Sequence, residues 1–274
     1  MNNGYKRWIE DTLDIVDKTG TLVPMKLNKI QDKFLTEDST NSKDIILKAR
    51  QQGFSSLILA MFTADFILKE NVYNVVVADN SDNAMGLLKR VKDYLKCWGD
   101  KRGVDVDKVL KYNSKYELYF AERNNTYKIG TAQNLNFGRS RTITNLHLSE
   151  VAFYPNIPDI IAGAGQATVE NGRMILETTA NGFNDFKKLW DESYLHEGGY
   201  ATHFYPASDF YPKEFLERKR NEFLALGKER LYRQEYPDTA LEAFITSGDL
   251  YFRQEALEQY LGKTKEPERT YLYV

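Results

Sequence analysis

The segment "ILKARQQGFSS", which runs from residue 46 to residue 56, contains residue types suited to binding a phosphate. Gly53 lets the backbone approach an anion closely, and the hydroxyl of Ser55 can bind Mg²⁺. A helix that begins here has backbone N–H groups without partners and a dipole that favours negative charge. The segment therefore predicts a phosphate-binding loop of the Walker A kind.

The cation of such a loop is displaced in this sequence. The position after Gly53, where these loops carry lysine, holds Phe54, which can contribute its backbone N–H. Lys48 at the opening of the loop and Arg50 within it are the candidate cations, because a long basic side chain can reach a phosphate from there. From residue types alone, an ordinary strand-to-helix turn with exposed Lys48 and Arg50 is an equally good interpretation.

The elements on either side of the loop suit a parallel α/β sheet. Residues 44–47 have the pattern of a buried strand, and residues 55–69 that of a helix apolar on nearly every side. The stretch "NVYNVVVADNSDNAMGLLKRVKDYL" repeats this order of strand, polar turn and helix. Strand–turn–helix units in series predict a parallel sheet covered by helices.

Weaker patterns complete the expected elements. They predict an amphipathic helix at 5–18, a short helix from Asn28, a hairpin around "RNNT" within 116–132, strands at 142–148 and 172–179, a helix at 183–194, and charged helices from Pro206. The change of pattern at Pro206 divides the chain into a core, residues 1–205, and a smaller C-terminal subdomain, residues 206–274.

Composition excludes several classes of protein. The chain has 274 residues and a net charge of −2, so binding to nucleic acid would need a local basic patch. One cysteine rules out an internal disulfide framework and fits a reducing cytoplasm, and the three histidines have no zinc-site spacing. No apolar run approaches the roughly 20 residues that a membrane span needs, so we expect no membrane contact.

Five motifs in order, over about residues 20–250, resemble the ATPase domain of the large terminase subunit of tailed bacteriophages. "KARQQGFSS" is similar to a variant Walker A loop in which the lysine opens the loop, so Lys48 takes the role of the missing lysine. "LVPMKLNKIQDKF" is similar to the adenine-recognition segment, with Gln31 as the base contact. The resemblance implies a nucleotide site made of Gln31, Lys48, Ala49, Arg50, Gln51, Gln52, Gly53, Phe54, Ser55 and Ser56.

"NLHLSEVAFYPN" resembles the Walker B strand of that family. Glu150 matches the glutamate that activates the attacking water. The acid that normally precedes it and holds Mg²⁺ is Ser149 here, which weakens the metal site or leaves the metal to Ser55 and the phosphates. A strand-end carboxylate on the surface is the structural alternative for Glu150.

Two further segments resemble functional motifs of the family. "FGRSRT" resembles the arginine segment, in which Arg139, or alternatively Arg141, would act as an arginine finger on a neighbouring subunit's nucleotide. "LETTANGFNDFKKLW" resembles the coupling motif, which would include Thr178, Thr179, Asn181 and Gly182. Thr179 and Asn181 could also serve to cap the helix that follows.

The resemblance implies a P-loop NTPase of the additional-strand class, with a mostly parallel sheet between helices and a small C-terminal lid. It implies ATP and Mg²⁺ as ligands and translocation of double-stranded viral DNA into a procapsid. The implied partners are the portal protein, the small terminase subunit and further copies in a ring on the portal, with a monomer in isolation, in the cytoplasm of the infected bacterium. We expect no nuclease activity, because the chain ends soon after the lid, where a linker to a nuclease domain would start.

Two alternatives remain from the sequence. One is a degenerate P-loop protein that acts as a scaffold or binds DNA without hydrolysing ATP, which Phe54 and Ser149 favour. The other is a helicase-like translocase, which would need a second motor lobe.

Overall fold

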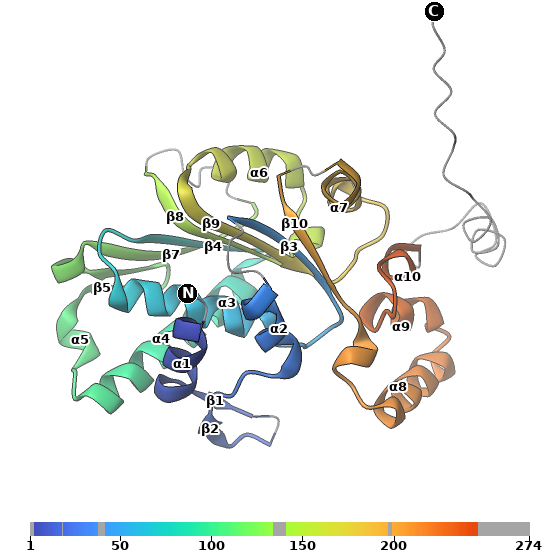
Figure 1. Ribbon diagram of the computed structural model, residues 1–274, viewed down its shortest axis with the longest axis horizontal. Coiled ribbons are helices and arrows are strands. Elements are labelled where there is room, and N and C mark those ends of the chain that lie inside the picture. Colours follow the sequence, from blue (N-terminus) through green and yellow to red (C-terminus); the bar gives the residue numbers. More distant parts are fainter. Residues whose placement is uncertain (1–2, 18, 38–41, 134–140, 197–198, 246–274) are drawn as a thin grey trace, which may run out of the picture.

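The computed structural model describes residues 3–17, 19–37, 42–133, 141–196 and 199–245, and its centre is a sheet of eight strands (Figure 1). The strand order is β10-β3-β9-β8-β4-β7-β6-β5. The strands from β10 through β7 pair in parallel, and β6 and β5 are antiparallel. Their bounds are β3 Lys43–Lys48, β4 Tyr73–Ala78, β5 Leu110–Asn113, β6 Glu117–Phe120, β7 Asn125–Thr131, β8 Ile143–Ser149, β9 Thr168–Thr178 and β10 Ala201–Tyr205.

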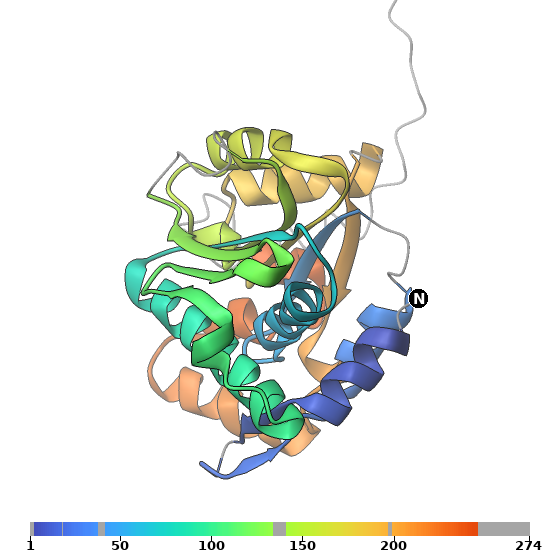
Figure 2. The same cartoon turned by 90° about the vertical axis from the view of Figure 1, so that its left-hand side faces the viewer.

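Helices cover both faces of this sheet. One face carries α1 Asn3–Thr12, α2 Lys29–Glu37, α3 Phe54–Leu68, α4 Ser81–Arg102 and, near β5, the short α5 Val106–Val109, and the other carries α6 Ile157–Gln166 and α7 Asp185–His196 (Figure 2). Each face has its own apolar core. Helix α3 is buried on nearly all sides, as its uniformly apolar sequence predicts. The predicted mostly parallel sheet between helices is confirmed.

The order of the strands creates the edge where the candidate site lies. Strand β9 is inserted between β3, which leads into the glycine loop, and β8, which ends at Ser149. This insertion is the arrangement expected of the additional-strand class. Because β3, β9 and β8 run parallel, the residues that follow them meet at one edge of the sheet.

The predicted helix at 5–18 is too long. Helix α1 ends at Thr12, and the chain then forms a two-stranded antiparallel sheet of β1 Asp14–Val16 and β2 Leu22–Pro24. The carboxylate of Asp17 closes the turn between them by accepting the backbone N–H groups of Thr19 and Thr21. An aspartate that bonds to the following backbone in this way favours a turn over a continued helix.

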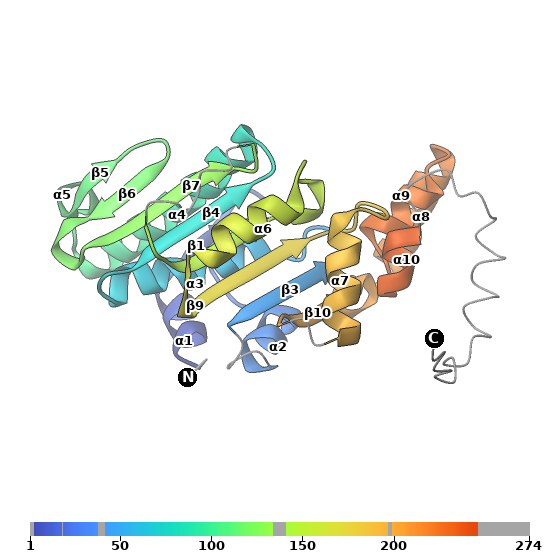
Figure 3. The same ribbon diagram turned by 90° about the horizontal axis from the view of Figure 1, so that it is seen from above.

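Three helices lie beyond the end of β10, at one end of the molecule (Figure 3). They are α8 Lys213–Ala225, α9 Glu229–Glu235 and α10 Ala240–Ile245. A small apolar cluster of Ala49, Ala207, Tyr211 and Tyr236 joins them to the glycine loop. Phe244 of α10 instead packs on Phe186 of α7, with the ring centroids 6.1 Å apart. The division at residue 205 and the role of a lid remain predictions.

Within the described part of the chain, no helix combines the length and the apolar character that crossing a membrane requires.

Candidate active site

A cleft of about 760 Å³ opens at the carboxyl ends of the parallel strands. The glycine loop forms one wall, and residues that follow β4, β8 and β9 form the rest. Its lining comprises Val16, Lys48, Arg50, Gln51, Gln52, Gly53, Phe54, Ser55, Ser56, Asp79, Arg90, Glu150, Phe153, Thr179 and Glu235. The fold therefore brings Lys48, Ser55 and Glu150 to one cavity, as the sequence predicted.

The backbone of the loop requires glycine at position 53. Gly53 has φ 83°, a left-handed conformation that L side chains rarely adopt, and it directly precedes α3. A Cβ atom at this position would lie 2.8 Å from Nε2 of Gln31. Conformation and space thus both select glycine, and α3 begins with its N–H groups at the cleft.

The side chain of Gln31 holds the backbone of the glycine loop through a hydrogen bond. Its Nε2 donates to the carbonyl of Gly53 at 2.7 Å, and its Oε1 accepts the backbone N–H of Asn28 at 3.0 Å. The side-chain amide of Asn28 in turn donates to the carbonyl of Gln52 at 3.1 Å. Gln31 is buried and is not among the residues that line the cleft, so its predicted contact with adenine remains a prediction.

The side chain of Phe54, which follows Gly53 in the loop, faces the core and not the cleft. The ring is fully buried. It packs edge-on against Phe34, with centroids 5.8 Å apart, and is tilted by 35° against Tyr205, with centroids 4.7 Å apart. A lysine here would place its ammonium group in an apolar pocket instead of in the cleft. The cation of the loop must therefore come from another position.

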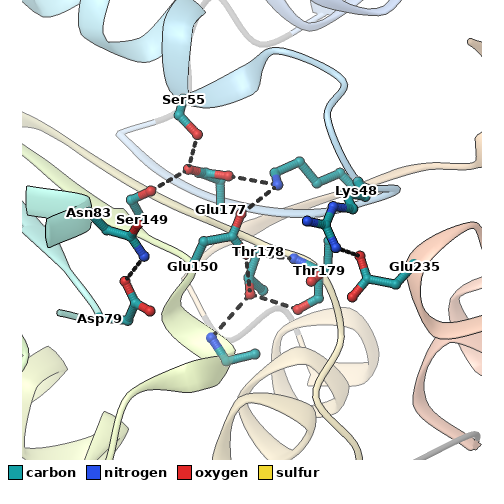
Figure 4. A network of polar contacts seen from close by, with 12 residues as sticks. Lys48, Ser55, Asp79, Asn83, Ser149, Glu150, Glu177, Thr178, Thr179 and Glu235 are labelled. Carbon is teal, nitrogen blue, oxygen red and sulfur yellow. Dashed lines mark hydrogen bonds and ion pairs between the residues drawn. The ribbon is translucent and has the colours of Figure 1, made fainter. Parts of the chain in front are cut away.

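Lys48, the last residue of β3, supplies a cation at the floor of the cleft. Its Nζ lies 3.0 Å from Oε1 of Glu150 and 3.1 Å from Oε2 of Glu177 (Figure 4). Burial alone would lower the pKa of Lys48, but the two carboxylates outweigh burial and hold that pKa above its ordinary range. The ammonium group is therefore charged and shared between two acids.

Glu177 is a buried acid that the sequence analysis missed; it contacts Lys48 and Ser55 of the cleft but is not itself among the residues that line it. It lies on β9, directly opposite Ser149 of β8, and is fully buried. Its Oε1 accepts hydrogen bonds from the hydroxyls of Ser55 and Ser149, each at 2.7 Å (Figure 4). Burial would raise the pKa of Glu177, but Lys48, His147 and the Ser55 hydroxyl hold it below its ordinary range. The available signal was an acid near the end of an otherwise apolar strand, "MILETT".

Glu150 follows β8 and faces the cleft, with 33% of its side chain exposed. Its backbone has φ 56°, a left-handed conformation that costs a residue with a side chain about 1–3 kcal/mol and that often occurs at functional sites. Its Oε2 accepts the N–H of Thr179 at 3.2 Å. Partial burial, opposed by Lys48 and reinforced by Glu177, raises the pKa of Glu150. Glu150 is therefore not the isolated surface carboxylate of the structural alternative.

The segment after β9 supports Glu150 and the turn that follows β8. The hydroxyl of Thr178 accepts the N–H of Ala152 at 3.2 Å, and the amide of Asn181 donates to the carbonyl of Ala152 at 3.1 Å. The first turn of α7 is capped by Asn184, whose Oδ1 accepts two backbone N–H groups. The helix-capping alternative for Thr179 and Asn181 is therefore wrong. Gly182, at φ 68°, begins the turn toward α7.

The remaining loop residues connect the cleft to the C-terminal helices. The backbone N–H of Arg50 donates to the carbonyl of Glu235 at 2.9 Å, and the hydroxyl of Tyr211 donates to the carbonyl of Arg50 at 2.7 Å. The Arg50 guanidinium lies 3.4 Å from Glu235, whereas Lys48 contacts the acids at the cleft floor. The side chain of Gln52 donates to the carbonyl of Pro206 at 3.0 Å.

Among the predicted arginines, Arg139 lies outside the described residues. Arg141 is described, and its guanidinium contacts the hydroxyl of Thr126 at 3.4 Å and the ring of Tyr73 at 5.6 Å. Thr126 and Tyr73 lie at the amino ends of β7 and β4, at the opposite sheet edge from Lys48. Arg141 therefore does not contribute to the cleft of its own chain.

The described residues include no cluster of three or more His, Cys, Asp or Glu side chains that could hold a metal by themselves. A divalent ion in this cleft would need oxygen ligands of other kinds as well, such as the hydroxyls of Ser55 and Ser149 or the phosphates of a nucleotide.

Comparison with known proteins shows the fold. No protein family model matches the chain, and no curated protein matches its sequence. The large terminase ATPase domain of Thermus phage P74-26 superposes with a TM-score of 0.58 at 15% identity, over 77% of this chain and 92% of that domain. The HK97 bacteriophage large terminase superposes with a TM-score of 0.68 at 15% identity, over 87% of this chain and 55% of that one.

The large terminase of a thermophilic bacteriophage, in complex with ATP-gamma-S, has a TM-score of 0.54 at 15% identity, over 78% of this chain and 52% of that one. The predicted resemblance is thus confirmed at the level of the fold, which is that of the ATPase domain of large terminases. The chain spans about half the length of the HK97 terminase and of the terminase in complex with ATP-gamma-S.

Proposed function

We propose that the chain is the ATP-hydrolysing motor domain of a viral terminase large subunit, which drives double-stranded DNA into a procapsid. The observation that carries the proposal is the convergence of Lys48, Ser55 and Glu150 in one cleft at the carboxyl ends of a parallel sheet. The terminase fold supports the motor class, and the complex of a terminase of this fold with ATP-gamma-S supports ATP as the nucleotide.

Binding of the triphosphate would rearrange the charges at the floor of the cleft. The backbone N–H groups of Gly53 to Ser56 and the dipole of α3 attract the phosphates. Lys48 is a flexible point charge that can leave the carboxylates and pair with phosphate oxygens. This exchange frees Glu150, which faces the cleft and is held by the N–H of Thr179.

Glu150 would then orient the attacking water and accept its proton. A positioned general base of this kind typically contributes about 10²–10⁴ in rate. Mg²⁺ would neutralise part of the phosphate charge. The side chains around the cleft suit this hard cation, because it prefers hydroxyl and carboxylate oxygens as ligands. Ser55, Ser149 and Glu177 provide such oxygens side by side.

Coupling to DNA would pass along the contacts described above. The motif of Thr178, Thr179, Asn181 and Gly182 touches Glu150 and the turn after β8, so it can respond to loss of the γ-phosphate. The loop is also bonded to Glu235 and Tyr211, which links the nucleotide to the proposed lid. DNA contacts would be made to phosphates and would weaken with salt, because a packaging motor must accept any sequence.

The assembly would be a ring on the portal, joined by the small terminase subunit in the cytoplasm of the infected bacterium, with single subunits in isolation. Arg139 of one subunit would stabilise the charge on the phosphate of its neighbour. A mixture of Arg139→Ala and Glu150→Gln subunits tests this, since a Glu150→Gln subunit can supply the arginine that the intact cleft of a neighbouring Arg139→Ala subunit lacks. Hydrolysis above the sum of the separate variants is expected. Activity equal to that sum in subunits assembled on the portal would exclude a finger acting between subunits.

The central experiment is steady-state ATP hydrolysis with Mg²⁺ and double-stranded DNA at high protein concentration. Lys48→Ala and Glu150→Gln should each lose about 100-fold or more of the rate. Lys108→Ala and Glu122→Gln are matched controls, because Lys108 is 83% exposed on α5 and Glu122 is exposed in the turn before β7. An inactive wild type that still binds ATPγS would favour the scaffold alternative. Full activity in Lys48→Ala would overturn the cation assignment.

A further inference from the structure

Glu177 and Ser149 form a pair that explains an anomaly of the site. The sequence places an uncharged residue, Ser149, where an acid is expected before the catalytic glutamate. The structure places an acid on the neighbouring strand instead. Ser149 and Glu177 are partners in the register of β8 and β9, and their side chains meet at 2.7 Å.

We propose that Glu177 is the carboxylate of the Mg²⁺ site, in place of residue 149. The inference rests on the proposed function, because the metal would enter with the nucleotide. Glutamate on β9 is long enough to bring its Oε1 between the hydroxyls of Ser149 and Ser55. Ser55 is the residue of the glycine loop that is suited to the metal, so Glu177 Oε1 already lies beside a second oxygen ligand.

A purely structural role as the counter-ion of Lys48 does not account for these contacts. Lys48 also pairs with Glu150, and it faces only Oε2 of Glu177. The other oxygen, Oε1, points to the two hydroxyls (Figure 4). Oε2 is taken up by the ion pair with Lys48, and Oε1 also lies 3.4 Å from Nε2 of His147. The atom of Glu177 that would meet a metal is therefore Oε1, beside the hydroxyls of Ser55 and Ser149.

The serine at position 149 follows from the same arrangement. An ionised aspartate there would stand next to Glu177 and Glu150, so three carboxylates would share the single ammonium group of Lys48. Repulsion between like charges at this range destabilises the ionised forms. Ser149 removes that repulsion and donates a hydrogen bond instead. We therefore expect the site to accept a carboxylate at either position 149 or position 177, provided that the other position is uncharged. A carboxylate at both positions, or at neither, should impair the site.

The test is to measure the affinity for ATPγS by calorimetry, once with Mg²⁺ and once with a chelator. The increase in affinity that Mg²⁺ confers is called the gain. Glu177→Gln should lose about 10-fold or more of this gain, a loss typical of a weakened metal site, while its affinity in chelator stays near that of the wild type. Ser149→Asp in the Glu177→Gln background should restore the gain. Glu122→Gln is the control and should keep it in full.

Other outcomes overturn the proposal. They are an unchanged gain in Glu177→Gln, an equal loss of affinity in Mg²⁺ and in chelator, and the absence of rescue by Ser149→Asp. If Glu177→Gln does not fold, Glu177→Asp keeps a negative charge in the pocket near Lys48 but, being one methylene shorter, draws the carboxylate back from the hydroxyl of Ser55. It should then lose the gain while remaining folded, and a retained gain contradicts the assignment.

The result separates this inference from the function on which it rests. A wild type that binds no ATPγS would overturn both. A wild type that binds ATPγS with a Mg²⁺ gain insensitive to Glu177 leaves the proposed motor function in place and rejects the metal assignment alone.

Discussion

The ammonium group of Lys48 lies 3.1 Å from the carboxylate of Glu177, at the end of a parallel strand and beneath the glycine loop. Both side chains are almost completely removed from solvent, 5% and 0% exposed respectively. A buried pair of this kind adds little net stability relative to an apolar pair, but loss of one partner is costly, because the other stays buried and charged.

Lys48→Met should therefore destabilise the fold as well as impair function. The uncompensated charge of Glu177 should lower the free energy of unfolding by about 3–5 kcal/mol. The second substitution Glu177→Gln should recover much of this loss. Denaturant unfolding of the two single variants and the double variant measures the coupling.

Lys89→Met is the control for that cycle. Lys89 pairs with Asp93 at 2.9 Å, but its side chain is 76% exposed. Exposed pairs contribute about 0–1 kcal/mol, so this variant should unfold close to the wild type. Equal losses in Lys48→Met and Lys89→Met would contradict the buried pair.

Gly53→Ala should weaken ATPγS binding. The left-handed backbone alone costs an alanine about 1–2 kcal/mol, and the new methyl group would press on Gln31, which holds the loop. Gly20→Ala is the matched control, because Gly20 has φ 82° and a Cβ added there would meet no atom within 4 Å. Unfolding and ATPγS titration of both variants should show similar backbone strain, but a loss of affinity only at Gly53.

Phe54→Lys should not rescue Lys48→Ala, although it restores lysine at the position usual for such loops. The side chain at position 54 occupies an apolar pocket against Phe34 and Tyr205. Burying an ammonium group there and losing the ring should cost about 3–5 kcal/mol or more. ATP hydrolysis and thermal unfolding of the double variant measure both effects, and recovery of hydrolysis would contradict the described orientation. Phe183→Lys, at a ring that is 58% exposed, controls for the added charge.

Alkaline pH should destabilise the fold in part through Tyr94 of α4. Burial raises the pKa of Tyr94 from 10.0 to about 12, and its hydroxyl donates to the carbonyl of Ser56 at 3.3 Å. Below pH 10 the phenol is protonated in both states, so its contribution is complete. Above pH 10 the unfolded chain loses the proton first, and stability falls until the folded pKa near 12 is reached.

The slope of the unfolding free energy against pH identifies the contribution of Tyr94. One such group removes at most about 1.4 kcal/mol of unfolding free energy per pH unit. Tyr94→Phe should make the stability curve shallower between pH 10 and 12, whereas Tyr116→Phe, at a side chain 59% exposed, should match the wild type. Denaturant unfolding at several pH values checks this, and an unchanged slope in Tyr94→Phe would argue against burial as the cause.

Local patterns were sufficient to predict the elements around the glycine loop. The apolar strand at 44–47 and the helix at 55–69 correspond to β3 and α3 within a residue or two. The hairpin around "RNNT" is also confirmed, as β6 and β7. Helix α6 and strand β10 were not predicted, because "THFY" is short and half-buried and the helix follows Asn156 within a loop-like segment.

Only the resemblance of its segment to a Walker B strand singled out Glu150. Residue types and near neighbours alone establish that a glycine loop stands between a buried strand and a buried helix, with Lys48 and Arg50 as its candidate cations. These features depend on positions only a few residues apart. The role of Glu177 depends on Ser149, 28 positions earlier, and on Ser55, 122 positions earlier. Only the parallel pairing of β3, β9 and β8 brings these side chains together, because strand register is set by packing across the whole sheet and not by the local chain.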